Sequence, residues 1–291
     1  MSLKPNIIAK KYNMQIFNDD DRICEKIGTL ENQSKNALCW AKTIENLQKF
    51  NSGIVICRSN HLDEIEKSKE VVYLSCNNPR LYFAKIVNSE FSYLLQDNFT
   101  NDVLKHRKNR KIRIGENVFI GKNVKIGDGT TIEHSSVIYS DTVIGSNCVI
   151  GPLVSIGTSG LGLEKDPDTN VYFSFPQIGG VVIEDYVHIG PSSTVRRSAL
   201  QNTVIKRGTK LGSLCNIGHN SIIGENCILT GNIIIAGSST IGNEVFFGIG
   251  TTVKNAVQIG DNSTLGQGSV VIHPVPPNET WVGNPAKKVI K

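Results

Sequence analysis

The sequence predicts a mainly β chain, in which a solenoid of short parallel strands follows a small N-terminal α/β domain. The main observation is that large apolar residues recur at every sixth position over roughly residues 112–275. A helix has a period of 3.6 and a lone strand a period of 2, so neither needs a period of six, whereas a solenoid must deliver one large side chain per short strand to a shared interior. The positions are Ile114, Ile120, Ile126, Ile132, Ile138, Ile144, Ile150 and Ile156, then Ile205, Leu211, Ile217, Ile223, Leu229, Ile235, Ile241, Phe247, Val253, Ile259, Leu265 and Val271.

Each six-residue unit carries two further signals. A small or β-branched residue stands two places before the large one, as at Val118, Thr130 and Cys148. Residues two apart share one face of a strand, so both are expected to point inward. A glycine such as Gly121 often follows the large residue and indicates a sharp bend.

The period is interrupted twice. The first interruption is a loop over residues 158–180, and a loop of that length inside a solenoid indicates a function of its own. The second lies between Val195 and Ile205, where the step is ten residues instead of six.

Residues 1–104 lack the six-residue period and predict an α/β domain. Ser52–Arg58 and Glu70–Cys76 are typical of short buried strands. Asn78 and Pro79 then predict the start of a helix, with Asn as the N-cap and Pro in the first turn. We therefore expect three parts: 1–104, the solenoid 105–275 with its inserted loop, and a C-terminal tail 276–291.

Composition narrows the function. The net charge of the 291 residues is +5 with only 20% charged residues, which does not indicate a nucleic-acid-binding protein. The one dense basic stretch, residues 105–111, is expected to be a solvated linker, with a phosphate contact as the alternative.

The cysteines and the hydropathy indicate the compartment. The seven cysteines contain no CxxC pair, so we expect reduced, buried thiols. Neither a secretion signal nor an apolar stretch long enough to span a membrane is apparent. We expect a cytoplasmic protein that does not insert into a membrane.

Four segments carry a family resemblance. They are FPQIGGVVI at 175–183, VRRSALQNTVI at 195–205, IGHN at 217–220 and NNPRLYFA at 77–84. In this order they resemble the UDP-3-O-acylglucosamine N-acyltransferases of lipid A synthesis, hexapeptide-repeat proteins with a left-handed parallel β-helix. The resemblance implies triangular coils that each contain three repeats, a nucleotide-binding N-terminal domain, and a homotrimer with active sites between subunits.

The sequence also departs from that family. Gly212 and Ser213 stand where the family usually has Asp-Asn, and Ala256 stands near its second functional histidine. Cys39 and Lys42 fall near the uracil-contacting Phe and Asn, and the family's helical tail is missing.

The end of the chain, residues 276–288, instead resembles the coenzyme-A-dependent hexapeptide sugar acetyltransferases. We therefore expect an N-acyltransferase that moves an acyl group from acyl-CoA to a nucleotide-linked amino-deoxysugar. The alternative is the lipid A enzyme itself, with acyl-carrier protein as donor.

The expected catalytic residues are His219 and Gly237. His219 lies off the inward stripe, and imidazole changes charge near neutral pH, as a general base requires. Gly237 lies three repeats later, which is one coil, so it should stack beside His219. The resemblance implies that the amide of Gly237 is the oxyanion donor. A surface histidine and a corner glycine without catalytic roles are the alternatives.

Five residues are expected to bind substrate: Trp40, Lys42, Phe175, Gln177 and Asn220. Trp40 could stack on a pyrimidine base, and the alternative is that it is an ordinary core tryptophan. Lys42 could contact a diphosphate, and the alternative is that it is an ordinary solvated lysine. The resemblance implies that the 158–180 loop reaches over a neighbouring active site, with loop packing as the alternative.

The acyl-donor site is expected to include Lys254, Gly248, Gly266 and Lys287, with the lysines near the phosphates of coenzyme A. No metal is expected, because His134, His188 and His273 lack partners at ligand spacing. A non-catalytic scaffold or an ice-binding surface is the competing class, although Thr130-Thr131 and Thr251-Thr252 are too sparse for a threonine array.

Overall fold

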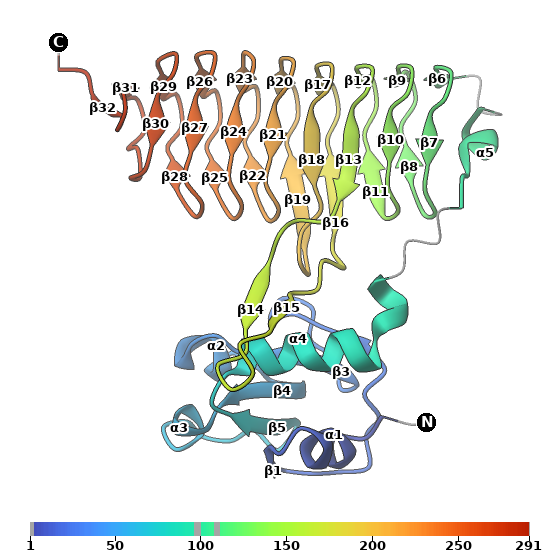
Figure 1. Ribbon diagram of the computed structural model, residues 1–291, viewed down its shortest axis with the longest axis vertical. Coiled ribbons are helices and arrows are strands. Elements are labelled where there is room, and N and C mark those ends of the chain that lie inside the picture. The colour runs from blue at the N-terminus through green and yellow to red at the C-terminus, as the bar shows by residue number, and fades with distance from the viewer. Residues whose placement is uncertain (1–2, 96–99, 108–110, 291) are drawn as a thin grey trace. The chain divides into compact units, whose positions relative to one another are not determined.

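The computed structural model describes residues 3–95, 100–107 and 111–290. The chain forms two compact units, drawn in Figure 1. The first contains Met1–Gln96 together with Leu161–Pro176, and the second contains Asp97–Gly160 and Gln177–Lys291.

The first unit is an α/β domain around a five-stranded sheet of order β1-β5-β4-β3-β2. Strands β2 to β5 run parallel and β1 is antiparallel to β5. The strands are β1 (Gln15–Phe17), β2 (Lys26–Ile27), β3 (Ala37–Trp40), β4 (Gly53–Arg58) and β5 (Val71–Cys76). The helices are α1 (Pro5–Lys11), α2 (Ile44–Gln48), α3 (Ser59–Leu62), α4 (Pro79–Glu90) and the 3-10 helix η1 (Ser92–Leu95).

The two strands and the helix predicted in this unit are confirmed as β4, β5 and α4. All of β5 and most of β4 are buried, as expected for parallel strands covered on both faces. The Asn78 side chain accepts a hydrogen bond from the amide of Leu81 at 3.2 Å, which is the predicted N-cap of α4.

Most of the 158–180 loop forms a hairpin, β14 (Leu163–Lys165) with β15 (Tyr172–Ser174), and this hairpin packs on α4. Lys85 of α4 pairs with Asp166 at 2.7 Å, and its hydrogen bond lowers the pKa of that carboxyl group. The Asn88 amide donates to the Ser174 carbonyl at 2.8 Å, and Arg80 pairs with Glu164. The loop thus contacts a helix of its own chain.

The second unit is a three-sided solenoid whose coils stack in order in Figure 1, and its strands run parallel except β32, which is antiparallel to β31. The ten-stranded sheet contains β6 (Arg113–Ile114), β9 (Thr131–Ile132), β12 (Val149–Ile150), β17 (His188–Ile189), β20 (Lys210–Leu211), β23 (Ile228–Leu229), β26 (Phe246–Phe247), β29 (Thr264–Leu265), β31 (Thr280–Val282) and β32 (Lys287–Lys288). The eight-stranded sheet contains β7 (Phe119–Ile120), β10 (Val137–Ile138), β13 (Ser155–Thr158), β18 (Thr194–Arg196), β21 (Asn216–Ile217), β24 (Ile234–Ile235), β27 (Thr252–Val253) and β30 (Val270–Val271). The seven-stranded sheet contains β8 (Lys125–Ile126), β11 (Thr142–Ile144), β16 (Gly180–Ile183), β19 (Asn202–Ile205), β22 (Ile222–Ile223), β25 (Thr240–Ile241) and β28 (Gln258–Ile259).

The six-residue period places the core as predicted. Every periodic residue is buried except Ile114 and Ile126, which are partly buried near the start of the solenoid. The inward positions expected for Cys148 and Cys215 are also confirmed, because both are at most 1% exposed.

The strand register shows how the two interruptions are accommodated. Ile217 pairs with Ile235, three repeats on, as in an uninterrupted coil. Ser155 pairs with Thr194 across the hairpin insertion, and Thr194 pairs with Asn216 across the ten-residue step. Each interruption therefore bulges from a corner without shifting the inward stripe.

The ends of the solenoid are covered. Val103, from α5 (Val103–Arg107), packs against the first coils. Trp281 of β31 pairs with Leu265 and packs against the last coils, and Ala286 is 3% exposed. The tail predicted at 276–291 thus closes the core at its C-terminal end. Residues 108–110 of the predicted basic linker lie outside the described residues.

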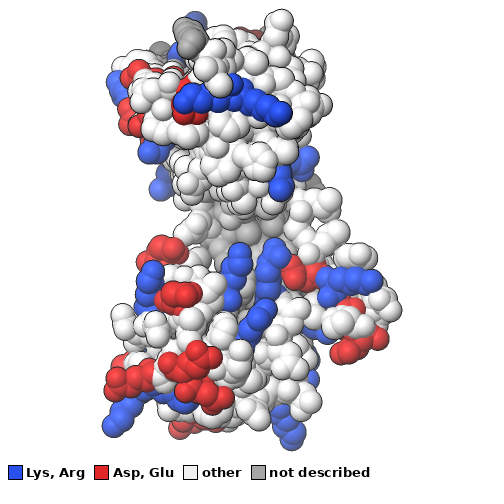
Figure 2. All heavy atoms as spheres, turned by 90° about the vertical axis from the view of Figure 1, so that its left-hand side faces the viewer, with Lys and Arg blue, Asp and Glu red and all other residues white. Residues whose placement is uncertain are grey.

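The charged side chains are of both signs. On the face in Figure 2, Lys and Arg side chains are interspersed with Asp and Glu. Within the described ranges, no helix is long and apolar enough to cross a membrane.

Candidate functional site

The candidate site lies at the solenoid corner where the chain passes from the eight-stranded to the seven-stranded sheet. His219 follows β21 at this corner and is half-buried, whereas its neighbours Ile217 and Ser221 are fully buried. Its imidazole therefore lies outside the core, as predicted, because the inward positions on either side of it are filled.

Gly237 lies in the next coil, directly beside His219. The Gly218 amide donates to the Ile235 carbonyl at 2.7 Å, and the Ser238 amide donates to the His219 carbonyl at 2.8 Å. A Cβ atom on Gly237 would lie 2.7 Å from Nε2 of His219, so a glycine is needed for the imidazole to sit there. The predicted stacking of these two residues is confirmed.

The amide of Gly237 makes no hydrogen bond within the described part of the chain. At another corner the equivalent amides of Glu225 and Asn243 are bonded by side chains of the following coil, at 2.9 and 2.7 Å. The Gly237 N–H is thus a donor that remains available to a ligand beside His219.

Asn220 forms hydrogen bonds with neighbouring residues of the solenoid corner. Its Oδ1 lies 2.8 Å from Nδ1 of His219 and accepts from the Ala199 amide at 3.2 Å. Its backbone amide donates to Oγ1 of Thr203 at 2.9 Å. A contact of Asn220 with substrate stays a prediction, but its carbonyl oxygen already has two protein partners.

Sequence reasoning missed the residues on the other flank of His219. A Cβ on Gly160 would lie 2.6 Å from Cδ2 of His219, so the first residues of the 158–180 loop pack against the imidazole. The Arg196 guanidinium donates to the Ser159 carbonyl at 2.9 Å and the Arg197 guanidinium to the Gly157 carbonyl at 2.8 Å, which hold this segment in place. In the sequence, the adjacent Arg196 and Arg197 are a signal that could have indicated this contact.

The expected substrate-binding aromatics lie in the α/β unit. The rings of Trp40 and Phe175 have centroids 6.0 Å apart, and Phe83 of α4 lies 5.8 Å from Phe175. The Arg80 guanidinium lies 4.6 Å from the centre of the Phe175 ring. Phe175 is thus buried in an aromatic cluster, with Trp40 partly exposed at its side.

The other expected substrate residues are not part of this cluster. Lys42 is exposed, and Gln177 is buried in the solenoid unit. A role for either in substrate binding stays a prediction.

The four expected acyl-donor residues are dispersed over the solenoid. Exposed Lys254 follows β27 on the same corner as His219. Gly248 and Gly266 follow strands of the ten-stranded sheet and stack on each other, with a Cβ on Gly248 meeting the Gly266 carbonyl carbon at 2.9 Å. Lys287 is exposed on β32. Only Lys254 shares a corner with His219.

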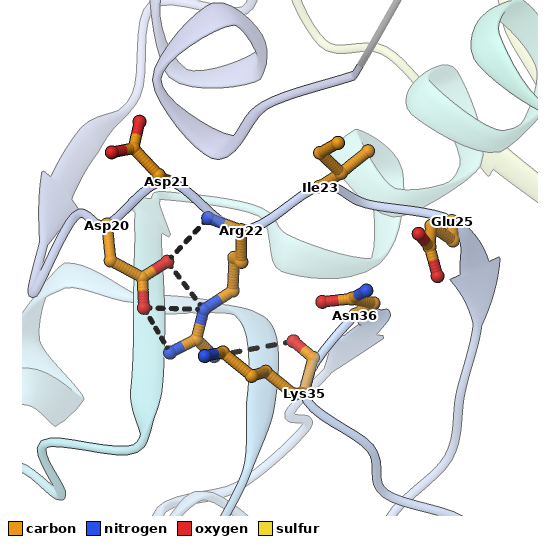
Figure 3. Close-up of a pocket in the computed structure, with 7 residues that line it drawn as sticks. All are labelled: Asp20, Asp21, Arg22, Ile23, Glu25, Lys35 and Asn36. Atoms are coloured by element: carbon orange, nitrogen blue, oxygen red, sulfur yellow. Dashed lines mark hydrogen bonds and ion pairs between the residues drawn. The ribbon is translucent and has the colours of Figure 1, made fainter.

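A pocket of about 450 Å³ in the α/β unit contains none of the expected site residues (Figure 3). Its buried Arg22 bonds to the Asp20 carboxylate at 2.6 Å and to the Gly53 and Glu70 carbonyls at 2.9 and 3.0 Å. The Arg22 hydrogen bond lowers the pKa of Asp20 to about 2. These bonds fix three chain segments together, so we assign the cluster a structural role.

Neither a metal-binding cluster nor a reactive thiol is found in the described ranges. These contain no group of three His, Cys, Asp or Glu residues that could hold a metal ion. All seven cysteines are free and buried, and burial raises the pKa of the Cys24 and Cys39 thiols to about 12. Such thiols stay protonated at neutral pH and are poor nucleophiles.

Comparison with known proteins identifies the repeats. A family model described as bacterial transferase hexapeptide (six repeats) matches residues 123–158 and 238–273. The UDP-3-O-acylglucosamine N-acyltransferase of Methylorubrum extorquens strain PA1 is 35% identical over 138 residues. A second enzyme of that name from Rhodopseudomonas palustris strain BisB18 is 38% identical over 136 residues. Both alignments cover 47% of this chain, but only 39% and 36% of the relatives.

Solved structures agree on the fold. The UDP-N-acetylglucosamine acyltransferase of Campylobacter jejuni matches with a TM-score of 0.51 and 22% identity, over 62% of this chain and 71% of that one. LpxA from Acinetobacter baumannii matches with a TM-score of 0.53 and 24% identity, over 62% and 67%. The solenoid thus contains hexapeptide repeats and has the left-handed parallel β-helix fold, and the chain resembles the UDP-3-O-acylglucosamine N-acyltransferases.

Proposed function

We propose that the protein is an N-acyltransferase that moves an acyl group from acyl-CoA to the amine of a nucleotide-linked amino sugar. The observation that carries this proposal is the pairing at one corner of a half-buried imidazole with an amide that has no acceptor in the described chain. A base and an oxyanion donor are the two groups that aminolysis of a thioester requires. The similarity to enzymes named as sugar-nucleotide N-acyltransferases supports the same chemistry.

The reaction assigns one role to each group. The amine nitrogen attacks the thioester carbonyl carbon, and the carbonyl electron pair moves to oxygen, where the Gly237 N–H donates a hydrogen bond. His219 takes the proton from the attacking nitrogen. When the tetrahedral intermediate collapses, the C–S bond breaks and coenzyme A leaves as a thiolate. The imidazolium of His219 then gives its proton to this sulfur.

The substrate assignments rest on residue chemistry. Trp40 offers an aromatic face for the nucleotide base, with Phe175, Gln177, Lys42 and Asn220 as further contacts. For the acyl donor, we assign binding of acyl-CoA to Lys254, which lies at the same corner as His219 two coils further along the solenoid. Lys287, Gly248 and Gly266 are the other residues proposed to bind acyl-CoA. The assembly in this proposal is a homotrimer with its sites between subunits.

A second candidate is UDP-3-O-acylglucosamine N-acyltransferase activity with acyl-carrier protein as donor. The names of the curated relatives favour it, although the alignments cover about two fifths of those proteins. The family's uracil-contacting Phe and Asn are replaced near Cys39 and Lys42, which favours a different nucleotide-linked acceptor.

A donor and acceptor matrix separates these functions. Purified protein is incubated with UDP- or dTDP-linked amino sugars and either acyl-CoA or acyl-carrier protein, and products are identified by mass spectrometry. Amide formation from acyl-CoA supports the proposal, whereas activity only with acyl-carrier protein establishes the second candidate. A protein that binds no nucleotide sugar and no acyl donor would instead be a scaffold.

A further inference from the structure

The orientation of the Asn220 amide is determined by its neighbours. An asparagine side chain can present either its oxygen or its NH2 group to the same place. Here the end of the Asn220 side chain that points toward His219 also lies 3.2 Å from the Ala199 N–H. Since two donors cannot bond each other, the oxygen of Asn220 must face Ala199.

This orientation determines the tautomer of His219. The same oxygen lies 2.8 Å from Nδ1 of His219 and has no proton to give. Nδ1 must therefore carry the proton, and in the neutral imidazole the lone pair is then on Nε2. Nε2 is the ring nitrogen nearest to Gly237, whose Cβ position is 2.7 Å away.

The donor that orients Asn220 is itself held firmly. Ala199 belongs to the ten-residue step between β18 and β19 and is 9% exposed. Its carbonyl accepts from the Ile178 amide at 2.8 Å, and the next carbonyl back, that of Ser198, accepts from the Gly179 amide at 3.1 Å. Asn220 also has a φ of 63°, a conformation in which asparagine is favoured. Its backbone amide donates a hydrogen bond to Oγ1 of Thr203.

We propose that Asn220 is a positioning residue that keeps His219 in the Nδ1–H tautomer, and that the Ala199 amide in the ten-residue step sets the orientation of Asn220. The ten-residue step thereby helps to keep the lone pair of His219 on Nε2. The inference rests on the proposed function for its catalytic meaning, since the Nε2 lone pair is the one offered to the substrate amine. The tautomer itself is a property of the free protein.

The test uses nitrogen NMR of the full-length protein labelled with ¹⁵N-histidine, with His219 assigned from the spectrum of His219→Gln. At a pH where the ring is neutral, we expect Nδ1 to be protonated and Nε2 to be unprotonated. In Asn220→Ala the ring should lose this preference and show a mixture of tautomers. Asn220→Asp keeps an acceptor for both donors and should retain the Nδ1–H form.

Activity provides the second readout. In Asn220→Ala we expect kcat to fall roughly 10- to 100-fold, by a larger factor than KM rises, because a wrong tautomer removes base catalysis. Asn220→Asp should restore much of kcat, with the acid limb of its pH profile moved to higher pH because a carboxylate favours the imidazolium.

Asn232→Ala is the matched control, since Asn232 is an exposed asparagine with a φ of 52° at a different corner. Asn232→Ala also places an alanine at a positive φ, but it removes no contact with His219. The NMR signals of the His219 ring and the kcat of this variant should therefore match those of the wild type. An Nε2–H tautomer in the wild type, or an unchanged ring in Asn220→Ala, overturns the inference. If the tautomers behave as stated and Asn220→Ala leaves acyl transfer unchanged, Asn220 still positions His219, and the proposed role of His219 as catalytic base is overturned.

Discussion

Replacing Gly237 with alanine is expected to impair the proposed base without unfolding the protein. The new Cβ would lie 2.7 Å from Nε2 and 2.8 Å from Cε1 of His219. Carbon and nitrogen atoms in contact are separated by about 3.5 Å, so the ring must retreat by roughly 0.7–1 Å. Because a misplacement of that size costs up to about 100-fold, we expect kcat to fall 10- to 100-fold.

Stability should change little in the same variant. Gly237 has no left-handed φ, and an alanine in an ordinary backbone conformation stabilises by about 0.5 kcal/mol through the unfolded chain. Gly231→Ala is the matched control, because its Cβ would meet no atom closer than 3.6 Å. Steady-state kinetics and urea unfolding of both variants decide the matter. Wild-type kcat in Gly237→Ala would refute the placement of His219 in the reaction.

Three further predictions concern other contacts. Gly160→Ala should lower kcat, since its Cβ would lie 2.6 Å from the imidazole on the opposite flank; unchanged kinetics would mean that the loop entry yields freely. Ile217→Ala should lower the free energy of unfolding by about 2–5 kcal/mol because Ile217 is fully buried, whereas Ile228→Ala, 47% exposed, should cost much less in the same urea titration. Asp20→Asn should destabilise the protein by about 1 kcal/mol at neutral pH, a value discounted because the carboxylate is 39% exposed. Since the pKa of Asp20 is lowered to about 2, that difference is present above about pH 4 and should disappear as the pH falls through 2.

The sequence predicts the solenoid well because its period is a direct consequence of the geometry. A spacing of three repeats is enough to place Gly237 beside His219, and the strand register agrees with it. Burial of Cys148 and Cys215 follows from the same alternation. These features depend on local repetition, which one chain displays by itself.

Other parts of the site depend on contacts between segments that no period relates. The approach of Gly160 to His219 and the bond from the Ala199 amide to Asn220 both arise where the period is broken. The packing of the β14–β15 hairpin on α4 depends on pairs such as Lys85 with Asp166, which are far apart in the sequence. Short strands β1 to β3 carry too few residues for a period to be recognised.

The most direct test of the proposed acyltransferase is turnover by His219→Ala with acyl-CoA and the best nucleotide-linked amino sugar from the matrix. General base catalysis contributes about 10²- to 10⁴-fold, so we predict a loss of that size in kcat. The variant must retain the circular dichroism spectrum and the oligomeric size of the wild type. Near-normal turnover by such a folded variant would contradict the assignment of this corner as the site of acyl transfer.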